Sequence, residues 1–251
     1  MSEDRRRPDL TGWSTSDLLR GALRLYRRNA PTFIGVLAVA FAATAGIQAA
    51  STLPGLTETS ALFLSAVSMM VAGTGSLALA RAALRRMHGQ PASIGDAYGF
   101  ILDRLSGYVG LLLLMAAIAL GVGLVGAIAS GILLSLGLGP LGLIVVGGLT
   151  LAVVVALALV PFGFADGLPV MEALERSRTL AQREWPALLL NVLLYAVPFL
   201  IGFWLLPTTT WGTAIDIVVN VVYTPFPLAF LGMIYLRALS AAVDASPAEE
   251  A

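Results

Sequence analysis

The chain has 251 residues, of which 58% are hydrophobic and only 12% are charged. A soluble domain carries about 25% charged residues, so this composition excludes a soluble globular protein. No polar segment is longer than about 30 residues, and this excludes a soluble catalytic domain, which needs at least about 50. The absence of Cys excludes disulfides, thiolate metal sites and thiol nucleophiles. The composition predicts a membrane protein with several spans.

Six apolar stretches are long enough to cross about 30 Å of hydrocarbon as helices. They cover residues 31–53, 61–84, 108–134, 141–164, 186–206 and 213–239. The third and fourth stretches form one uncharged run, which we divide at residues 135–140 because Gly and Pro cluster there and favour a turn. We therefore expect an all-α fold, a bundle of six transmembrane helices.

The basic residues indicate how the chain is oriented. All fifteen are Arg, and the connections at residues 52–60, 135–140 and 207–212 contain none of them. The intervening segments carry every Arg, so basic and bare connections alternate along the chain. Because cytoplasmic loops are enriched in basic residues, this pattern predicts that both termini are cytoplasmic.

The basic segments resemble one another and predict an internal repeat. The copies begin at Ser14, Ser93 and Pro169, so they are spaced by 79 and then 76 residues. Asp17 and Asp96 follow the two serines at the spacing of a capping box, which starts a helix. The first and third copies also match at a constant offset of 155 residues: Leu19, Leu25, Arg28 and Pro31 correspond to Leu174, Leu180, Arg183 and Pro186.

Each unit is predicted to consist of a short amphipathic helix followed by two spans. The units cover residues 13–88, 89–166 and 167–240 of a single membrane domain, between flexible cytoplasmic tails at 1–12 and 241–251. An even number of crossings in each unit makes the repeats parallel.

The amphipathic segment of the first unit carries Arg24, Arg27 and Arg28 opposite its apolar face. We interpret it as a helix in the headgroup layer, with these arginines and Arg183 as candidate contacts to anionic lipid headgroups. The alternative is a cytoplasmic extension of the next span. Arg81 and Arg237 are expected to snorkel from the cytoplasmic ends of their spans.

Residues 172–177 (EALERS), 183–185 (REW), Pro225 and 234–237 (IYLR) carry a family resemblance. With the capped helix, they resemble the membrane-domain family found alongside glycerophosphoryl diester phosphodiesterases, and related six-span bacterial proteins of unassigned function. The resemblance extends from Trp13 to Arg237, although the family's last span usually ends in aromatic-Asp-Leu-Arg and the Asp is missing here. It implies a membrane module of the bacterial inner membrane, because the family's phosphodiesterase activity belongs to a separate soluble barrel.

One face of the last span carries Asp216, Asn220 and Thr224 at four-residue steps. At a similar depth, other spans are expected to carry Thr44, Gln48, Ser65 and Ser68. Gln48 completes the candidate polar cavity with the three residues of the last span. Intramembrane acids are costly and point to function, although a purely structural role for Asp216 is an equal alternative. In the same span, Pro225 and Pro227 each remove a backbone donor, which predicts either a hinge or a static kink.

A stripe of small residues recurs every four positions in the third apolar stretch. It consists of Gly123, Ala127, Gly131, Ser135 and Gly139. Small residues let helices approach closely, so we expect packing here, either within one protomer or between copies in a homo-oligomer or with a protein partner.

These features favour a non-enzymatic integral membrane protein, a lipid-contacting scaffold or partner module at the cytoplasmic leaflet. Anionic membrane lipids are its expected partners; no catalytic residue, cofactor, metal site or nucleic-acid partner is predicted. The alternative is a permease for a small solute or a lipid, with an outward cavity near Asp216. A membrane-embedded hydrolase is third, because hydrolysis requires a base, an orienting partner and usually a metal.

Overall fold

The structure is a computed structural model that describes residues 10–51, 57–205 and 219–244. Within these ranges every regular element is helical, so the expected all-α fold is confirmed. The elements are α1 (Thr15–Ser51), α2 (Glu58–Met87), α3 (Ile94–Asp103), α4 (Leu105–Ser135), α5 (Gly139–Leu157), α6 (Val160–Ala165), α7 (Val170–Leu205), the wide helical turn η1 (Val219–Tyr223) and α9 (Pro225–Asp244).

Five helices in the described part are long and apolar enough to cross a membrane, as an integral membrane protein requires. They are Thr15–Ser51, Glu58–Met87, Leu105–Ser135, Gly139–Ala165 and Val221–Ala242. The predicted turn between the third and fourth spans is confirmed, since α4 ends at Ser135 and α5 begins at Gly139. α7 runs through the stretch predicted as the fifth span, so a six-span chain stays a prediction.

Helices begin directly after each of the three predicted unit starts, at Thr15, Ile94 and Val170. Both predicted capping boxes are present. In the second, the Asp96 amide donates to the Ser93 hydroxyl at 3.1 Å, and the Ser93 amide donates to the Asp96 carboxylate at 3.3 Å. Hydrogen bonding with Ser93 lowers the pKa of the Asp96 carboxyl.

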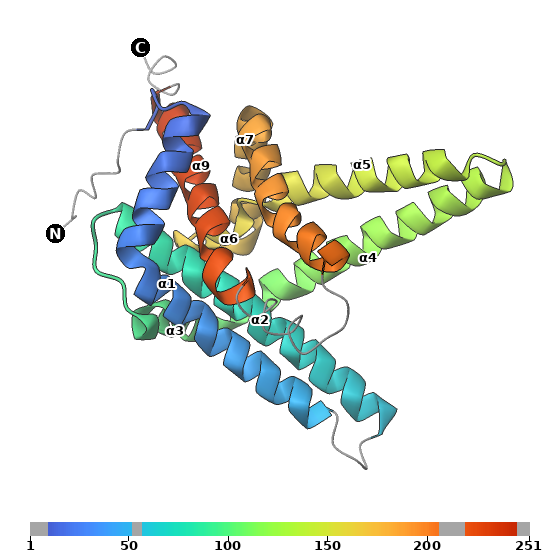
Figure 1. Cartoon of the computed structure of the whole chain (residues 1–251), viewed down its shortest axis with the longest axis horizontal. Coiled ribbons are helices and arrows are strands. Elements are labelled where there is room, and N and C mark those ends of the chain that lie inside the picture. Colours follow the sequence, from blue (N-terminus) through green and yellow to red (C-terminus); the bar gives the residue numbers. More distant parts are fainter. Residues whose placement is uncertain (1–9, 52–56, 206–218, 245–251) are drawn as a thin grey trace.

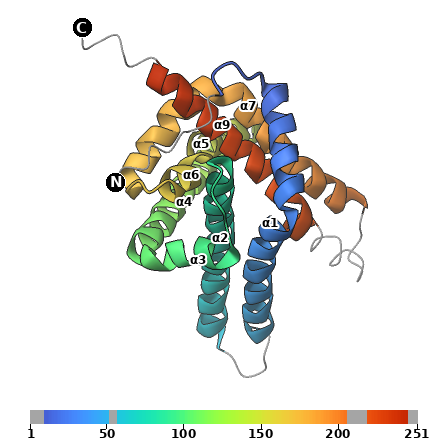
Figure 2. The same cartoon turned by 90° about the vertical axis from the view of Figure 1, so that its left-hand side faces the viewer.

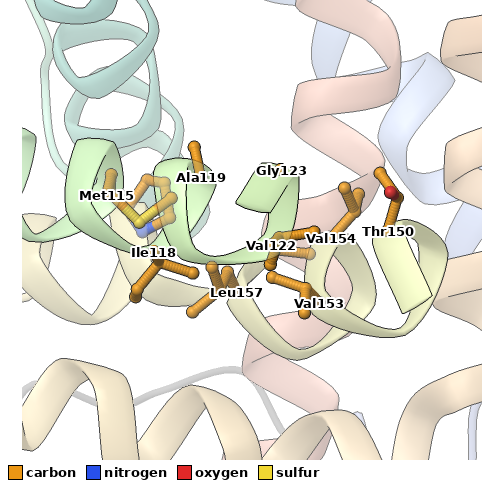
Figure 3. Close-up of a pocket in the computed structure, with 11 residues that line it drawn as sticks. Met115, Ile118, Ala119, Val122, Gly123, Thr150, Val153, Val154 and Leu157 are labelled. Carbon is orange, nitrogen blue, oxygen red and sulfur yellow. The ribbon is translucent and has the colours of Figure 1, made fainter. Parts of the chain in front are cut away.

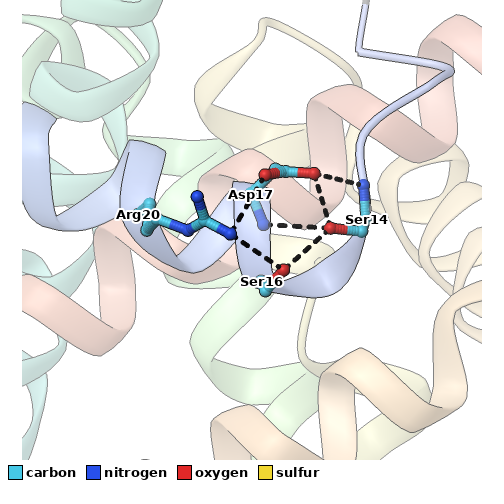
Figure 4. A network of polar contacts seen from close by, with 4 residues as sticks. All are labelled: Ser14, Ser16, Asp17 and Arg20. Atoms are coloured by element: carbon cyan, nitrogen blue, oxygen red, sulfur yellow. Dashed lines mark hydrogen bonds and ion pairs between the residues drawn. The ribbon is translucent and has the colours of Figure 1, made fainter.

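The first capping box has the same reciprocal geometry. The Asp17 amide donates to the Ser14 hydroxyl at 3.2 Å, and the Ser14 amide donates to the Asp17 carboxylate at 3.1 Å. Figure 4 shows Ser16 and Arg20 completing this network, with Arg20 3.6 Å from the Asp17 carboxylate. The exposed first turn of α1 is therefore closed by its own side chains.

The predicted short amphipathic helix is separate from the following span only in the second unit, where α3 ends at Asp103 and α4 begins at Leu105. In the first and third units a separate short helix was the wrong expectation, and the alternative of an extension of the span holds, because the amphipathic segment continues into the span. α1 has 37 residues and is about 55 Å long, well beyond the hydrocarbon thickness. Pro31 lies inside α1, and Figure 1 shows that the helix changes direction along its length.

The core lies at the arginine-rich ends of the spans rather than along their whole length. Its largest wholly buried side chains are Leu18, Phe33, Leu77, Leu79, Leu84, Leu159, Phe162, Phe164, Leu188, Phe230, Ile234 and Tyr235. Leu10 is only 3% exposed and belongs to the same core. α9 is the central helix: 67% of its most apolar window is buried, against 11% for α4 and for the span formed by α5 and α6.

Away from this core the helices diverge. The α1–α2 pair and the α4–α5 pair leave the core in different directions (Figures 1 and 2). A Cβ on Gly126 of α4 would lie 3.3 Å from Val146 of α5, so α4 and α5 meet closely at this glycine. Gly123 and Gly131 have no atom within 4 Å of such a Cβ, so the predicted small-residue stripe does not make this contact within the protomer.

The sixth predicted span is not one continuous helix in the described part, because η1 ends at Tyr223 and α9 begins at Pro225. Neighbouring helices bond to the interruption. The Tyr26 hydroxyl donates to the Val222 carbonyl at 2.7 Å, and the Tyr223 hydroxyl donates to the Leu194 carbonyl at 2.8 Å. The first bond gives a partner to a backbone carbonyl at the break, as a broken helix requires, and the second attaches the break to α7.

Candidate functional site

At the arginine-rich end, two guanidinium groups bond to the chain that leaves α6. Arg81 of α2 donates to the Ala165 carbonyl at 2.7 Å, and Arg104 donates to the Gly167 carbonyl at 2.8 Å. Both stack against Phe100 of α3, at 4.4 Å and 5.3 Å from the ring centroid. These contacts satisfy carbonyls at a helix end, which have no partner within the helix itself.

A second group of polar contacts joins the N-terminal turn, α7 and α9. Arg237 of α9 forms a two-pronged ion pair with Glu184 of α7 and donates to the Trp13 carbonyl at 2.9 Å. The side chains of Arg237 and Glu184 are only 14% and 11% exposed. Arg81 and Arg237 were expected to snorkel toward lipid headgroups; the structure corrects this, because both guanidinium groups bond to protein.

The other candidate arginines differ sharply from these two. Arg24, Arg27 and Arg28 of α1 and Arg183 of α7 are exposed, and none has an ion-pair or hydrogen-bond partner within the described ranges. On the opposite face of α1, Leu18 and Ala22 are completely buried. The amphipathic face of α1 thus packs on protein, and its arginines point away from the core.

A cavity of about 290 Å³ lies where α1, α2 and the start of α9 meet. It is lined by Leu37, Ala40, Phe41, Thr44, Ala72, Ser76 and Thr224. Of the residues that the sequence assigned to a polar cavity, Thr224 lines this one, next to Thr44, which was expected only at a similar depth. Ser76 was missed, although it ends a run of small and hydroxyl-bearing residues at 73–76 inside an apolar span.

The other predicted cavity residues are not brought together in the part of the chain that the structure describes. Asp216 lies outside the described residues. Asn220 belongs to η1, and its side chain is also outside what is described. Gln48 is exposed on α1 and is not among the residues that line the cavity.

A second cavity, of about 520 Å³, lies between α4 and α5. Figure 3 shows the side chains that surround it, with Thr150 as the one polar side chain in the described lining. Gly123 of the small-residue stripe borders this cavity, so the absence of a side chain there opens space between the helices. The sequence predicted a stripe of small residues here but not a cavity. The cavity depends on the spacing between α4 and α5, which the sequence does not give.

Among the described residues, no group of three or more His, Asp or Glu side chains is placed to hold a metal ion. The polar side chains described above thus form two groups, the arginines and their partners at the arginine-rich end and the hydroxyls that line the smaller cavity. Comparisons of the chain with protein-family models, with curated proteins and with solved structures found no match.

Proposed function

We propose that this protein is a non-enzymatic integral membrane protein that contacts anionic lipid headgroups at the cytoplasmic leaflet and acts there as a scaffold or partner module. The observation that carries the proposal is the division of the arginines into two groups. Arg81, Arg104 and Arg237 bond to protein, whereas Arg24, Arg27, Arg28 and Arg183 are exposed without partners in the described ranges.

The position of the second group supports a lipid contact. Arg27 and Arg28 lie within one turn of Pro31, where the apolar part of α1 begins. Arg183 lies at the corresponding place before Pro186 in α7. A basic residue close to an anionic membrane surface contributes about 1 kcal/mol, so these four side chains together would give a substantial attraction.

The core supports a scaffold. The arginine-rich end contains most of the buried side chains, so α1, α7 and α9 hold one another there without a bound partner. A tightly packed end that carries exposed arginines is what we expect of a rigid module that binds lipid surfaces. The resemblance to the phosphodiesterase-associated membrane family remains a hypothesis that would fit this role.

The test is the simultaneous replacement of Arg24, Arg27 and Arg28 by Gln in the full-length chain. The purified parent chain and the variant are each reconstituted in nanodiscs that contain phosphatidylglycerol and phosphatidylcholine, and the lipid that stays bound to the protein on re-extraction is measured. The variant should retain less phosphatidylglycerol relative to phosphatidylcholine than the parent chain does. Loss of about 1 kcal/mol for each of the three arginines predicts a fall of about 100-fold in relative retention.

The matched control is Arg20→Gln on the same helix. Arg20 already pairs with Asp17 at 3.6 Å, so its charge is partly compensated and its loss should change lipid retention little. Replacement of the same three arginines by Lys should preserve retention, because the attraction depends on charge near the surface. Unchanged retention in the Gln variant would leave these arginines as topology signals and would overturn the proposal.

A further inference from the structure

The cavity between α1, α2 and the start of α9 has a mixed lining. Thr44 comes from α1, Ser76 from α2, and Thr224 from the residue between η1 and α9. Three hydroxyl-bearing residues therefore converge from three separate elements, while Leu37, Phe41 and two alanines complete the wall. Hydroxyls placed among apolar helices are costly unless they form hydrogen bonds, so a shared cavity requires an explanation.

The backbone beside the cavity is irregular. η1 is a wide turn that ends at Tyr223, next to Thr224, and Pro225 and Pro227 follow it. Wide turns of this kind occur frequently at functional sites. At membrane depth, broken helices are tolerated only where protein buries them or where they line a cavity, and here the break does line one.

Thr44 gives a further indication. Its Oγ1 atom is fully buried and has no hydrogen-bond partner within the described ranges. Thr44 also lines the cavity, so the hydroxyl without a partner belongs to a residue of the cavity wall. A polar occupant of the cavity could supply the hydrogen-bond partner that this atom lacks.

The chemistry of the lining restricts the occupant. No ionisable side chain is among the described residues that line the cavity, and a charge inside a membrane requires a partner. The volume of about 290 Å³ is at the lower end of the range for small-molecule sites. We propose that this cavity binds a small uncharged solute with both hydroxyl and apolar groups, a short-chain alcohol or diol. This inference does not rest on the lipid contact proposed above.

The experiment uses the absence of Cys in this chain. Thr44→Cys and Ser76→Cys are made separately in the full-length protein, with Ala43→Cys as the matched control one residue along α1 on an exposed face. Each variant is reconstituted in liposomes and treated with methyl methanethiosulfonate, a small uncharged reagent. Since only the thiolate reacts and its formation requires water, Cys at positions 44 and 76 should react about tenfold faster than Cys at position 43.

Protection by a solute then tests binding. 1,2-Propanediol should slow the reaction at positions 44 and 76 several-fold in a saturable manner. Lactate, which has a carboxylate in place of one hydroxymethyl group, and sorbitol, which is larger, should not slow it at equal osmolality. Circular dichroism and size-exclusion chromatography identify the variants that fold. Equal rates at positions 43, 44 and 76 would overturn the cavity, and fast but unprotected reaction would overturn the solute site.

Discussion

The ion pair between Glu184 and Arg237 is the most buried contact between charged residues in the described part of the chain. It connects α7 to α9, and Arg237 also donates to the Trp13 carbonyl at 2.9 Å. Neither side chain is more than 14% exposed. A buried pair of this kind adds little net stability over a well-packed apolar pair, but removal of one partner leaves a charge without compensation.

We expect Glu184→Leu to lower the free energy of unfolding by about 3–5 kcal/mol, because the Arg237 guanidinium then remains buried without a carboxylate. The double variant Glu184→Leu with Arg237→Met should recover much of this loss. A denaturant titration of the detergent-solubilised chain, followed by circular dichroism, measures both. Additive effects of the two substitutions would show that the pair is not energetically coupled.

Single-residue patterns in the sequence were most informative where the interaction is local. The capping boxes at Ser14 and Ser93 were predicted because both partners lie within one turn. The roles of Arg81 and Arg237 were not, because their partners Ala165 and Glu184 are 84 and 53 residues away in sequence. An arginine near the end of a span has the same sequence signature whether it reaches lipid or protein.

At the scale of helices, the α4–α5 pair shows which small residues make close contacts within the protomer. The predicted stripe includes Gly123 and Gly131, yet the close contact is made by Gly126 opposite Val146. Gly142 of α5 similarly lies opposite Ser130, whose Cα would be 3.4 Å from an added Cβ. Glycines are numerous in both helices, so spacing alone could not select the face that touches the partner helix.

This difference gives a matched pair of substitutions. Gly126→Leu would place its side chain against Val146, where the space is already filled, and should destabilise the chain by about 1–3 kcal/mol. Gly131→Leu, at an exposed position with nothing within 4 Å, should change stability by less than about 0.5 kcal/mol.

Thermal unfolding in detergent compares the two variants, and size-exclusion chromatography with light scattering reports their oligomeric state. A Gly131→Leu variant that loses an oligomer present in the parent chain would assign the stripe to contacts between copies. Equal stability of both variants would contradict the packing described for Gly126.

The lengths of α1 and α7 show that the amphipathic segments of the first and third units are parts of long helices and not separate short ones. Both helices begin where a unit was predicted to begin and continue through a proline into the span. Periodicity identified part of the buried face, since Leu18 and Ala22 are buried whereas Leu23, which the same pattern includes, is 44% exposed. It could not distinguish burial against lipid from burial against protein, because both environments select the same side chains.

The orientation of the whole molecule remains a prediction that single cysteines can test. Cys introduced at Thr57 or Thr209 should react with an impermeant thiol reagent applied to intact cells, because the adjacent connections contain no Arg. Cys at Ser106 or Ser246 should react only after the cells are permeabilised. Labelling of position 106 in intact cells would contradict both the orientation and the six-span chain.

The sequence by itself determined the class of the protein, the number of apolar stretches and the points where helices start. These properties depend on composition and on interactions within a few residues, namely hydrophobic runs, capping boxes and glycine-rich turns. The structure agrees with them in the all-α fold, in the turn between α4 and α5, and in the helix starts at Thr15, Ile94 and Val170.

Only the tertiary structure decided which arginines are used inside the protein, where the core lies and which hydroxyls share a cavity. Thr44, Ser76 and Thr224 are brought together by the crossing of α1 and α2 with the break before α9. Such convergence depends on helix crossing and divergence, which arise from packing between segments far apart in the sequence. In a chain that is apolar almost throughout, hydrophobic patterning cannot specify that packing, because most faces of each helix are equally suited to lipid and to protein.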